Sequence, residues 1–525
     1  MPILTTDIAS IKGVSTVEKL FAILVTLLMS RQILAGGYDP AKTGISADTP
    51  YTILNAPAAA ELFGFGSQLH RMATYFFKSA GSSVPCTAFP LAAAAGGAAA
   101  TKTITFATNA TGSGTYIFRL GSYLNEDILT LSVSSGSTPD AVAAALAALV
   151  ATKPNLPFTA GVALGVVTLT AKTLDLTSES LQVTINQKTE EGALQPAGMT
   201  AAVADDVTGI GSSDLSNLWA YIASEQTPWN TNIVHPYITA TELDGGRDAI
   251  GNPNQLTGLY DSKDYRPAHI FTVDTAGGEA GLTAAIVLGE SRKNTDPANC
   301  RLAAPDYPEL SHEIASYVSG FIALNAMVRS SSGYTRLQMP ALYGPLDPAE
   351  DWTTIAPAGL KAYDNRNKAV RAGIAPIIYK GEIAQPGDVV TFWHPDDNQN
   401  APFKYVVNAR KIWNCQNLTD IYLNGTDLLD RPIVNSVAAV RQSELAIDAD
   451  TIQAGLAQIA GVFENFGWIY GAVFTIRNTT VTENDTNPDR FDIVMPIITS
   501  GNNRVNSGEI QVDRNLQAFD LTLSV

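Results

Sequence analysis

The sequence is short of charge, and the charge that it has is mostly acidic. Only 16% of the 525 residues are charged, against roughly 25% in an ordinary soluble domain. Lysine and arginine total 33 against 50 aspartates and glutamates, which gives a net charge of -17. Proteins that bind nucleic acids neutralise phosphates with clustered basic residues, and this sequence has no such cluster. We therefore expect no direct contact with DNA or RNA.

Cysteine is also scarce. The three cysteines, Cys86, Cys300 and Cys415, lie far apart and form no CxxC pair. Neither a zinc site of common spacing nor a disulfide framework is indicated. We expect a chain that folds in a reducing cytoplasm, with each cysteine buried as a small apolar side chain.

Long apolar runs are absent as well. The first residues, MPILTTDIASIKG, have no basic region ahead of an apolar core, so no export signal is indicated. The longest early apolar run, residues 20–29, is about half as long as a membrane span requires. We interpret this run as a buried strand and expect no insertion into a membrane.

Two sequence patterns begin like metal sites and then break off. His312 and Glu313 open like a zincin motif, but Ser316 stands at the position of the second histidine. Residues 485–489 open like a calcium loop, but the glycine and the final glutamate of such loops are missing. We interpret the second stretch as a solvent-exposed turn.

Two further groups lack the partners that a ligand site needs. His394, Asp396 and Asp397 share one loop without a distant fourth ligand, which is more often an ordinary loop than a metal site. Gly64 and Gly66 precede a helix, as in a dinucleotide-binding motif, but the third glycine and the later acidic residue are lacking. A Walker A loop and a GxSxG motif are absent too. We predict no catalytic, cofactor-binding or metal site, and no enzyme.

What the sequence does contain is a series of segments with different compositions. Residues 91–100, LAAAAGGAAA, are of low complexity and indicate a linker. From 101 to about 206, short runs of Thr, Ser, Val and Leu alternate, and one helix at 139–152 has a threonine cap and a proline at its first position. We interpret this part as a β-rich insert, joined to the rest at Ala100 and near Gly209.

The remaining segments alternate between helix and strand patterns. The predicted fold class is α+β / α/β multidomain: a mixed α/β core with a β-rich inserted domain and extended N- and C-terminal arms. Predicted strands of the insert are 103–107, 116–120, 128–133, 166–171 and 181–185. Predicted helices elsewhere are 57–63, 67–79, 214–225, 277–290, 309–330, 358–371 and 449–465. Predicted strands elsewhere are 20–29, 233–235, 269–273, a pair across 385–388, 472–481 and 490–498.

The C-terminal residues 516–525, LQAFDLTLSV, predict a strand, because apolar and polar residues alternate from Phe519 onward. Such a strand can complete its own sheet, which the pattern alone favours, or pair with the sheet edge of another subunit. The N-terminal residues have isolated apolar positions without a clear period, as in an extended arm or a disordered terminus. The apolar positions of the two arms are Leu516, Phe519, Leu521, Leu523 and Val525 at the C-terminus, and Ile8, Ile11, Val14 and Val17 at the N-terminus.

Several stretches of the sequence, taken in order, are similar to one known family. They are 58–78 (AAAELFGFGSQLHRMATYFFK), 166–172 (VVTLTAK), 363–381 (YDNRNKAVRAGIAPIIYKG), and 487–496 (NPDRFDIVMP) with the terminal strand. Together they resemble the contractile tail sheath proteins of Mu-like bacteriophages. That family usually has an Arg-x-x-Thr-Thr-Tyr-like strand after the hairpin at Gly381, where this sequence reads VVTFWH at 389–394.

The resemblance implies a self-assembling structural subunit. Sheath subunits stack as hexameric rings in a helical polymer around a tail tube, and their contraction drives the tube through the host envelope. The implied partners are further copies of the chain, the tail tube protein, and baseplate and tail terminator proteins. The implied location is the virion, after assembly in the host bacterial cytoplasm. The resemblance also favours terminal arms that lend strands to neighbouring subunits.

The resemblance and the changes in composition divide the chain into seven parts. They are an N-terminal arm (1–19), a first part of the core (20–91), a linker (92–100), an outward-projecting insert (101–208), an α/β middle core (209–354), a tube-facing α+β domain (355–515) and a C-terminal arm (516–525). Three alternatives stay open: the sheath of a phage-tail-like bacteriocin or injection system, a tail-associated lysin, and a glycan-binding surface protein.

Overall fold

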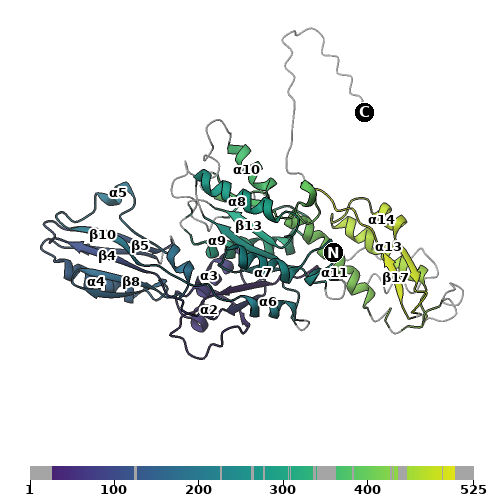
Figure 1. Cartoon of the computed structure of the whole chain (residues 1–525), viewed down its shortest axis with the longest axis horizontal. Helices are drawn as coiled ribbons and strands as arrows, with labels where there is room; N and C mark the ends of the chain where they lie inside the picture. Colours follow the sequence, from purple (N-terminus) through teal and green to yellow (C-terminus); the bar gives the residue numbers. More distant parts are fainter. Residues whose placement is uncertain are drawn as a thin grey trace, which may run out of the picture.

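The computed structural model describes most of the chain between residues 27 and 502. These residues form an elongated molecule in which a β-rich part, a central sheet and a helical part follow one another along the long axis (Figure 1). The predicted mixed α/β character is confirmed. The described residues are 27–122, 127–224, 227–261, 265–275, 278–304, 307, 309–334, 338–339, 362–380, 383–425, 428–429, 431–434, 446–487 and 489–502.

The central sheet has eight strands in the order β15-β14-β13-β12-β11-β1-β3-β2. Its inner strands run parallel, and the edge strands β2 and β15 are antiparallel to their neighbours. After β1 the chain builds one side of the sheet with β2 and β3, and after the insert it builds the other side from β11 onward. The strands are β1 (Gln32–Gly36), β2 (Tyr51–Ile53), β3 (Cys86–Pro90), β11 (Asn232–Val234), β12 (His269–Asp274), β13 (Asn299–Ala303), β14 (Ile374–Lys380) and β15 (Ile383–Pro386).

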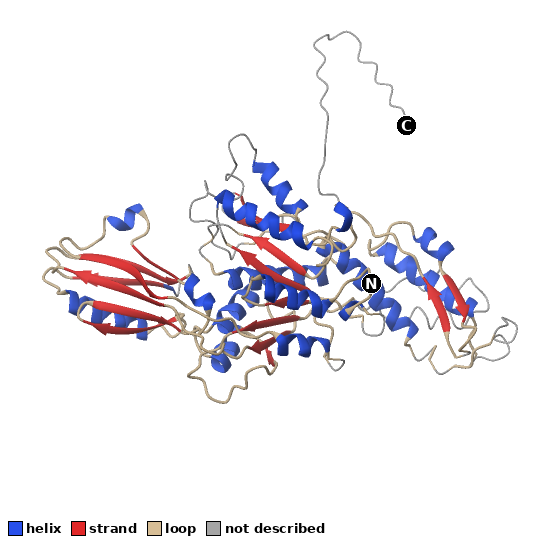
Figure 2. Ribbon diagram, in the orientation of Figure 1, coloured by secondary structure: helices blue, strands red, loops and turns tan. Residues whose placement is uncertain are grey.

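Helices cover both faces of the central sheet (Figure 2). Successive strand residues point to opposite faces, so the neighbours Ile33 and Leu34 belong to different hydrophobic clusters. Leu34 packs with α2, α3 and α9, and Ile33 packs with α6 and α7. Ala303 and Ile374 pack with α8 and α10. The helices are α2 (Ala56–Phe63), α3 (Gln68–Ala80), α6 (Ser216–Ala223), α7 (Ala240–Ile250), α8 (Gly278–Arg292), α9 (Ser311–Val328) and α10 (Ala362–Arg371), with the 3-10 turn η4 (Gly258–Tyr260).

The strands between residues 101 and 207 form two antiparallel sheets, in the orders β10-β4-β8-β7 and β6-β5-β9. Together with α4 they enclose a hydrophobic cluster. The two connections to the central part lie side by side, because Ala98 and Ile210 exchange two backbone hydrogen bonds of 3.1 Å. The elements are β4 (Thr101–Ala107), β5 (Gly114–Gly121), β6 (Ile128–Val133), α4 (Pro139–Ala151), β7 (Phe158–Ala163), β8 (Val166–Ala171), η3 (Leu176–Ser180), β9 (Gln182–Ile185), α5 (Thr189–Gly192) and β10 (Thr200–Val207).

The helical part at the other end of the molecule packs around its own hydrophobic cluster, which includes Leu456, Phe463 and Trp468. It contains a small sheet, in which β16 and β17 pair with each other and with no other strand among the described residues. The elements of this end are α11 (Val406–Leu423), α13 (Ala449–Asn465), α14 (Ala472–Asn478), β16 (Thr480–Glu483) and β17 (Phe491–Val494), preceded by the 3-10 turn η6 (Pro395–Asp397).

Local sequence explains where the predicted helices begin. Asn55, Ser67 and Thr138 each accept a hydrogen bond from a backbone N–H three residues later, which caps α2, α3 and α4. The other predicted helices correspond to α6, α8, α9, α10 and α13, with ends that differ by a few residues. Helices and strands that the sequence did not predict are α5, α7, α11, β1, β2, β3, β7, β10 and β13.

The strand predicted at 20–29 is wrong for the residues that the structure describes there. Residues 27–30 form no strand, and β1 begins after them. Leu28 instead packs against Trp413 of α11, and its N–H donates to Asn414 Oδ1 at 3.0 Å. An apolar run predicts burial, but it does not distinguish a strand from a packed irregular segment.

Two further predictions in the C-terminal third are wrong. Residues 472–481 were predicted as one strand, but most of them form α14. The Glu464 carboxylate accepts hydrogen bonds from the N–H groups of Gly471 and the next residue, at 3.1 and 3.2 Å, and so starts the helix. The strand pair predicted across 385–388 is shifted, because β14 ends and β15 begins before that stretch.

Two smaller expectations also have structural counterparts. Cys86, Cys300 and Cys415 are all buried thiols, as predicted. Among the described residues, no helix combines the length and the apolar character that a membrane span needs.

Candidate functional site

In sheets of this type, ligands usually bind at the carboxyl edge where the chain passes from one half of the sheet to the other. Here that position lies between β1 and β11, with Gly37 after β1 and Tyr237 a few residues after β11. The N-terminus of α3 lies there too, because the Leu69 N–H donates to the Gly37 carbonyl at 3.0 Å. A ligand site would be expected at this edge of the sheet.

The chain fills this position with residues of its own. Thr177 of the β-rich part accepts from Gln68 Nε2 at 2.8 Å and donates to Asp175 Oδ1 at 2.6 Å. The other carboxylate oxygen of Asp175 accepts from the Tyr237 hydroxyl at 3.1 Å. Burial raises the pKa of Asp175, and the hydrogen bonds from Thr177 and Tyr237 only partly offset this. The turn at 175–177 thus occupies the usual ligand position.

Gly64 and Gly66 serve packing between parts of the chain. Gly66 has a φ of 77°, and a Cβ at this position would lie 2.1 Å from the carbonyl oxygen of Leu156 in the β-rich part. Its N–H donates to His70 Nδ1 at 2.9 Å. The glycine spacing that resembles a dinucleotide-binding motif therefore permits a close backbone contact at the start of α3.

Both patterns that begin like metal sites are parts of ordinary structure. Burial, together with the nearby charge of Arg71, lowers the pKa of His312 to about 3. The next residue, Glu313, accepts from Arg71 Nε at 2.6 Å inside the protein. The calcium-like stretch at 485–487 is an exposed turn, in which Asn484 Oδ1 accepts from two backbone N–H groups.

The loop with His394 and Asp397 meets Glu290 of α8. The ligand atoms of these three side chains lie within 4.8 Å of one another, and among the described residues no other such group is found. Asp396 is not part of it. The ammonium group of Lys293 lies 2.5 Å from Asp397 Oδ1 and 3.4 Å from Glu290 Oε2. A lysine therefore already compensates both carboxylates, and a divalent cation would have to displace it.

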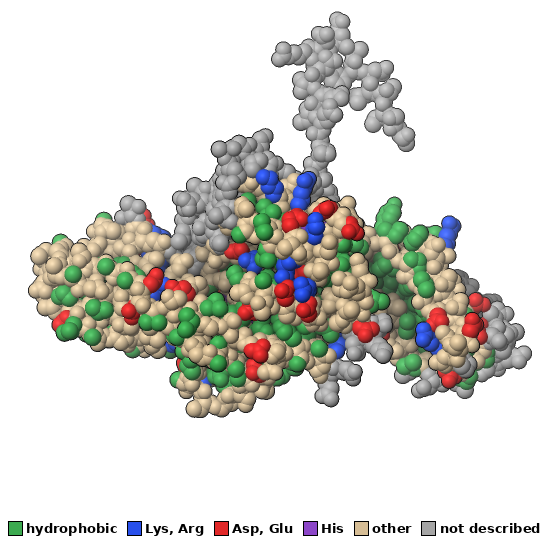
Figure 3. Space-filling model, in the orientation of Figure 1, with side chains coloured by type: hydrophobic (Ala, Val, Ile, Leu, Met, Phe, Trp, Pro, Cys, Tyr) green, Lys and Arg blue, Asp and Glu red, His purple; other side chains and the backbone are tan. Residues whose placement is uncertain are grey.

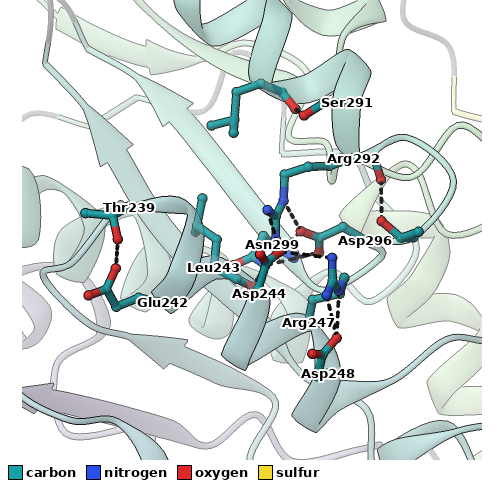
Figure 4. A network of polar contacts seen from close by, with 12 residues as sticks. Thr239, Glu242, Leu243, Asp244, Arg247, Asp248, Ser291, Arg292, Asp296 and Asn299 are labelled. Atoms are coloured by element: carbon teal, nitrogen blue, oxygen red, sulfur yellow. Dashed lines mark hydrogen bonds and ion pairs between the residues drawn. The ribbon is translucent and has the colours of Figure 1, made fainter.

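A polar network joins α7, α8 and the start of β13 (Figure 4). The buried Asp296 carboxylate accepts from Arg292 Nε at 2.7 Å and from Asn299 Nδ2 at 2.9 Å. Asp244 of α7 lies 2.8 Å from Arg292 and 2.9 Å from Arg247. Both carboxylates face arginines, so the network positions the helices on the sheet and offers no uncompensated acid or base.

Exposed apolar side chains gather on and around α14. Tyr470 is 73% exposed and Val473 is 58% exposed, and Figure 3 shows apolar atoms on the upper surface of this end. In the same part, β16 and β17 each have one edge that pairs with no described strand. Exposed apolar patches and open strand edges mark protein–protein contacts. The exposed apolar side chains of this part are Phe466, Tyr470, Val473, Phe474, Ile476, Val494 and Ile498.

The assembly residues predicted from the sequence all lie outside the described residues and remain predictions. They are Ile8, Ile11, Val14, Val17, Leu516, Phe519, Leu521, Leu523 and Val525. Sequence reasoning also missed the residues that fill the ligand edge. Gln68 lies in the stretch that carries the family resemblance, whereas no sequence signal marks Asp175, Thr177 or Tyr237.

Comparison with known proteins gives one curated relative of informative similarity, and no family model matches the chain. The relative is the Mu-like prophage FluMu tail sheath protein of Haemophilus influenzae, which is 30% identical over 185 residues. The match covers 35% of this chain and 36% of that protein, so the chain spans about a third of the relative's length in this match. The resemblance to tail sheath proteins of Mu-like phages is thereby confirmed.

Two solved structures are similar at a lower level. The sheath tail protein from Desulfitobacterium hafniense has a TM-score of 0.42 and 11% identity, with 90% of this chain and 97% of that chain covered. The helical sheath of the anti-feeding prophage in its contracted state has a TM-score of 0.43 and 11% identity, with 94% of each chain covered. TM-scores of this size support no conclusion about function.

Proposed function

We propose that this chain is the structural subunit of a contractile tail sheath. The observation that carries the proposal is the 30% identity to a tail sheath protein over 185 residues. The filled carboxyl edge of the central sheet supports it, because the position at which such folds usually bind a ligand is occupied by the turn at 175–177.

In this proposal the subunits stack as hexameric rings around a tail tube, within a virion tail assembled in the host bacterial cytoplasm. The subunits contract and drive the tube through the host envelope. The partners are further copies of the chain, the tube protein, and baseplate and tail terminator proteins. Residues 355–515 would face the tube. The insert, residues 101–208, would project outward. The β-rich part and the helical part from α11 onward lie at opposite ends of the molecule, which supports placing them on different sides (Figure 1). Of the range 355–515, α10, β14 and β15 belong to the central sheet and its helices.

The terminal arms, residues 1–19 and 516–525, would lend strands to neighbouring subunits. A strand added to an open sheet edge forms backbone hydrogen bonds without a large rigid surface, so it can persist while other contacts rearrange. The unpaired edges of β16 and β17 and the exposed apolar side chains around α14 support an acceptor at this end of the molecule.

The test is electron microscopy of the purified full-length protein, combined with size-exclusion chromatography over a range of concentrations. We expect a concentration-dependent shift to large species that appear as hollow tubes with a regular helical repeat. A species that stays monomeric at every concentration and cleaves peptidoglycan would contradict the proposal and favour a lysin. A monomer that binds glycans would favour the adhesin alternative.

A further inference from the structure

The insert meets the central part of the molecule through a buried arginine, Arg71 of α3. The terminal nitrogens of Arg71 donate to the two carboxylate oxygens of Asp127 in the insert, at 2.9 and 2.8 Å. One of them also donates to Ser122 Oγ at 2.8 Å. Arg71 Nε donates to Glu313 Oε1 of α9 at 2.6 Å. A single guanidinium therefore joins α3, α9 and the insert.

This ion-pair cluster is closed to solvent. The side chain of Arg71 is 3% exposed, and those of Asp127 and Glu313 are 0% exposed. Burial lowers the pKa of Arg71, but the charges of the two carboxylates raise it by more, so the guanidinium stays charged. Separating a buried ion pair leaves uncompensated charges without water to solvate them. The cluster therefore resists small rotations of the insert against the core.

A second set of contacts lies on the same side of α3. Gln68 and Arg71 are three residues apart and share one face of the helix. Gln68 binds the turn at 175–177, and this turn also binds Tyr237 beyond β11. Two sets of polar contacts thus hold the insert, one over α3 and α9 and one over the carboxyl edge of β1 and β11. The close approach of Gly66 to Leu156 and the packing of Leu310 add to them.

The covalent connections alone would not fix the insert. The chain enters the insert through residues 92–100, which consist of alanine and glycine and form no helix or strand. It leaves near Gly209, and the pairing of Ala98 with Ile210 holds the two connections together. Two adjacent connections form a hinge, about which a body without further contacts would rotate.

We infer that the Arg71 cluster and the turn at 175–177 lock the insert to the central sheet, so that core and insert move as one rigid body. Arg71, Asp127 and Asp175 are positioning residues in this arrangement. The inference concerns the single subunit and does not rest on the proposed function. If the chain polymerises, every displacement of the core carries the insert with it through the same angle.

The test uses three full-length variants. Arg71→Met removes the guanidinium that crosses between core and insert. Tyr237→Phe combined with Thr177→Val removes the second set of contacts without changing charge or leaving a large cavity. The matched control is Arg119→Met, because Arg119 forms a two-pronged ion pair with Glu191 that lies entirely inside the insert, with side chains 6% and 10% exposed.

Two measurements test whether the insert is held rigidly against the core. Elastase cleaves next to small residues. Ala99 and Ala100, at the end of the linker, are buried, so the rate of cleavage at these two residues reports how often the linker end becomes accessible, and mass spectrometry identifies the cut. Small-angle X-ray scattering reports the spread of core–insert distances. All six tryptophans lie outside residues 101–208, so tryptophan fluorescence shows separately whether the core is folded.

We expect cleavage to rise about tenfold or more in Arg71→Met, less in the Tyr237→Phe/Thr177→Val variant, and not at all in Arg119→Met. The scattering profile should broaden in the same order. Unchanged cleavage and scattering in both Arg71→Met and the Tyr237→Phe/Thr177→Val variant, with a folded core, would overturn the inference. If Arg71→Met does not yield a folded core, the Tyr237→Phe/Thr177→Val variant decides alone.

Discussion

The hydroxyl group of Tyr237 donates to a carboxylate oxygen of Asp175 at 3.1 Å, although the two residues belong to different parts of the fold. Tyr237 follows a strand of the central sheet and Asp175 lies in the insert. Tyr237 also lies 2.9 Å from the Ser213 hydroxyl, where the chain returns from the insert. This contact fills the edge at which a parallel sheet usually binds a ligand. The edge binds the insert instead.

The first prediction concerns the close contact at the start of α3. Gly66→Ala should lower the free energy of unfolding by more than about 2 kcal/mol, because it combines a positive φ with a Cβ placed 2.1 Å from the Leu156 carbonyl oxygen. Gly81→Ala is the control: its φ is also positive, but nothing lies within 4 Å of the added Cβ. Chemical denaturation of both variants measures the difference. Equal losses would show that the close contact contributes nothing.

The second prediction concerns removal of the insert. The paired backbones of Ala98 and Ile210 allow a short splice that replaces residues 101–208. We expect a folded core with lower stability, because the buried Leu310 packs in the insert's hydrophobic cluster and would become exposed. Exposing a leucine costs about 2 kcal/mol. Tryptophan fluorescence during urea unfolding gives the measurement.

A substitution at Leu310 provides the control for this excision. Leu310→Ser should destabilise the full-length protein but improve the solubility of the spliced protein. A spliced protein that does not fold at all would show that residues 101–208 belong to the core.

The third prediction concerns acid sensitivity. Burial lowers the pKa of His235 to about 4 and that of His312 to about 3, the latter with help from Arg71. An unfolded histidine has a pKa of about 6.5, so the unfolded state binds protons that the folded state does not. Stability should therefore fall as the pH drops below about 6.5, by roughly 2 kcal/mol per histidine at pH 5.

The comparison of wild type with His235→Gln at pH 7 and pH 5 measures this contribution. The variant loses its titrating group, so its stability should decline less between the two pH values, whatever its stability at pH 7. The same decline in both proteins would mean that His235 does not titrate differently in the folded and unfolded states.

The fourth prediction concerns the C-terminal arm and rests on the proposed function. Deleting residues 516–525 should leave a folded subunit that forms no long tubes, because the lent strand is lost. Phe519→Ser with Leu523→Ser should have the same effect, and Thr522→Ala with Ser524→Ala, on the other face of the strand, should not. Negative-stain microscopy of each variant tests this. Normal tubes from the truncated protein would rule out strand exchange by this arm.

Local sequence determined a large part of the fold in advance. The cap Thr138 with the proline that follows it, and the apolar periodicity of 67–79, placed α4 and α3 within one residue of their ends. Apolar and polar residues alternate over 129–133 and 167–171, within the strands predicted there. These signals are local, since a cap or a period-two pattern requires only neighbours in the chain.

Other elements depended on contacts with residues outside their own segment. The stretch 472–478 is helical because Glu464 caps it. Leu28 lies in an irregular segment because it packs against Trp413 and donates a hydrogen bond to Asn414. Strand propensity in the first case and an apolar run in the second predicted a strand. Contacts with other segments of the chain overrode both patterns.

The sequence by itself determined the composition classes, the linker at 91–100, the capped helices and the likeness to tail sheath proteins. Only the tertiary structure decided that Arg71 bridges Asp127 and Glu313, and that the turn at 175–177 occupies the edge between β1 and β11. The physical reason is range: caps and periodicity act over a few residues, whereas a buried charge is stable only beside partners that folding brings from distant positions.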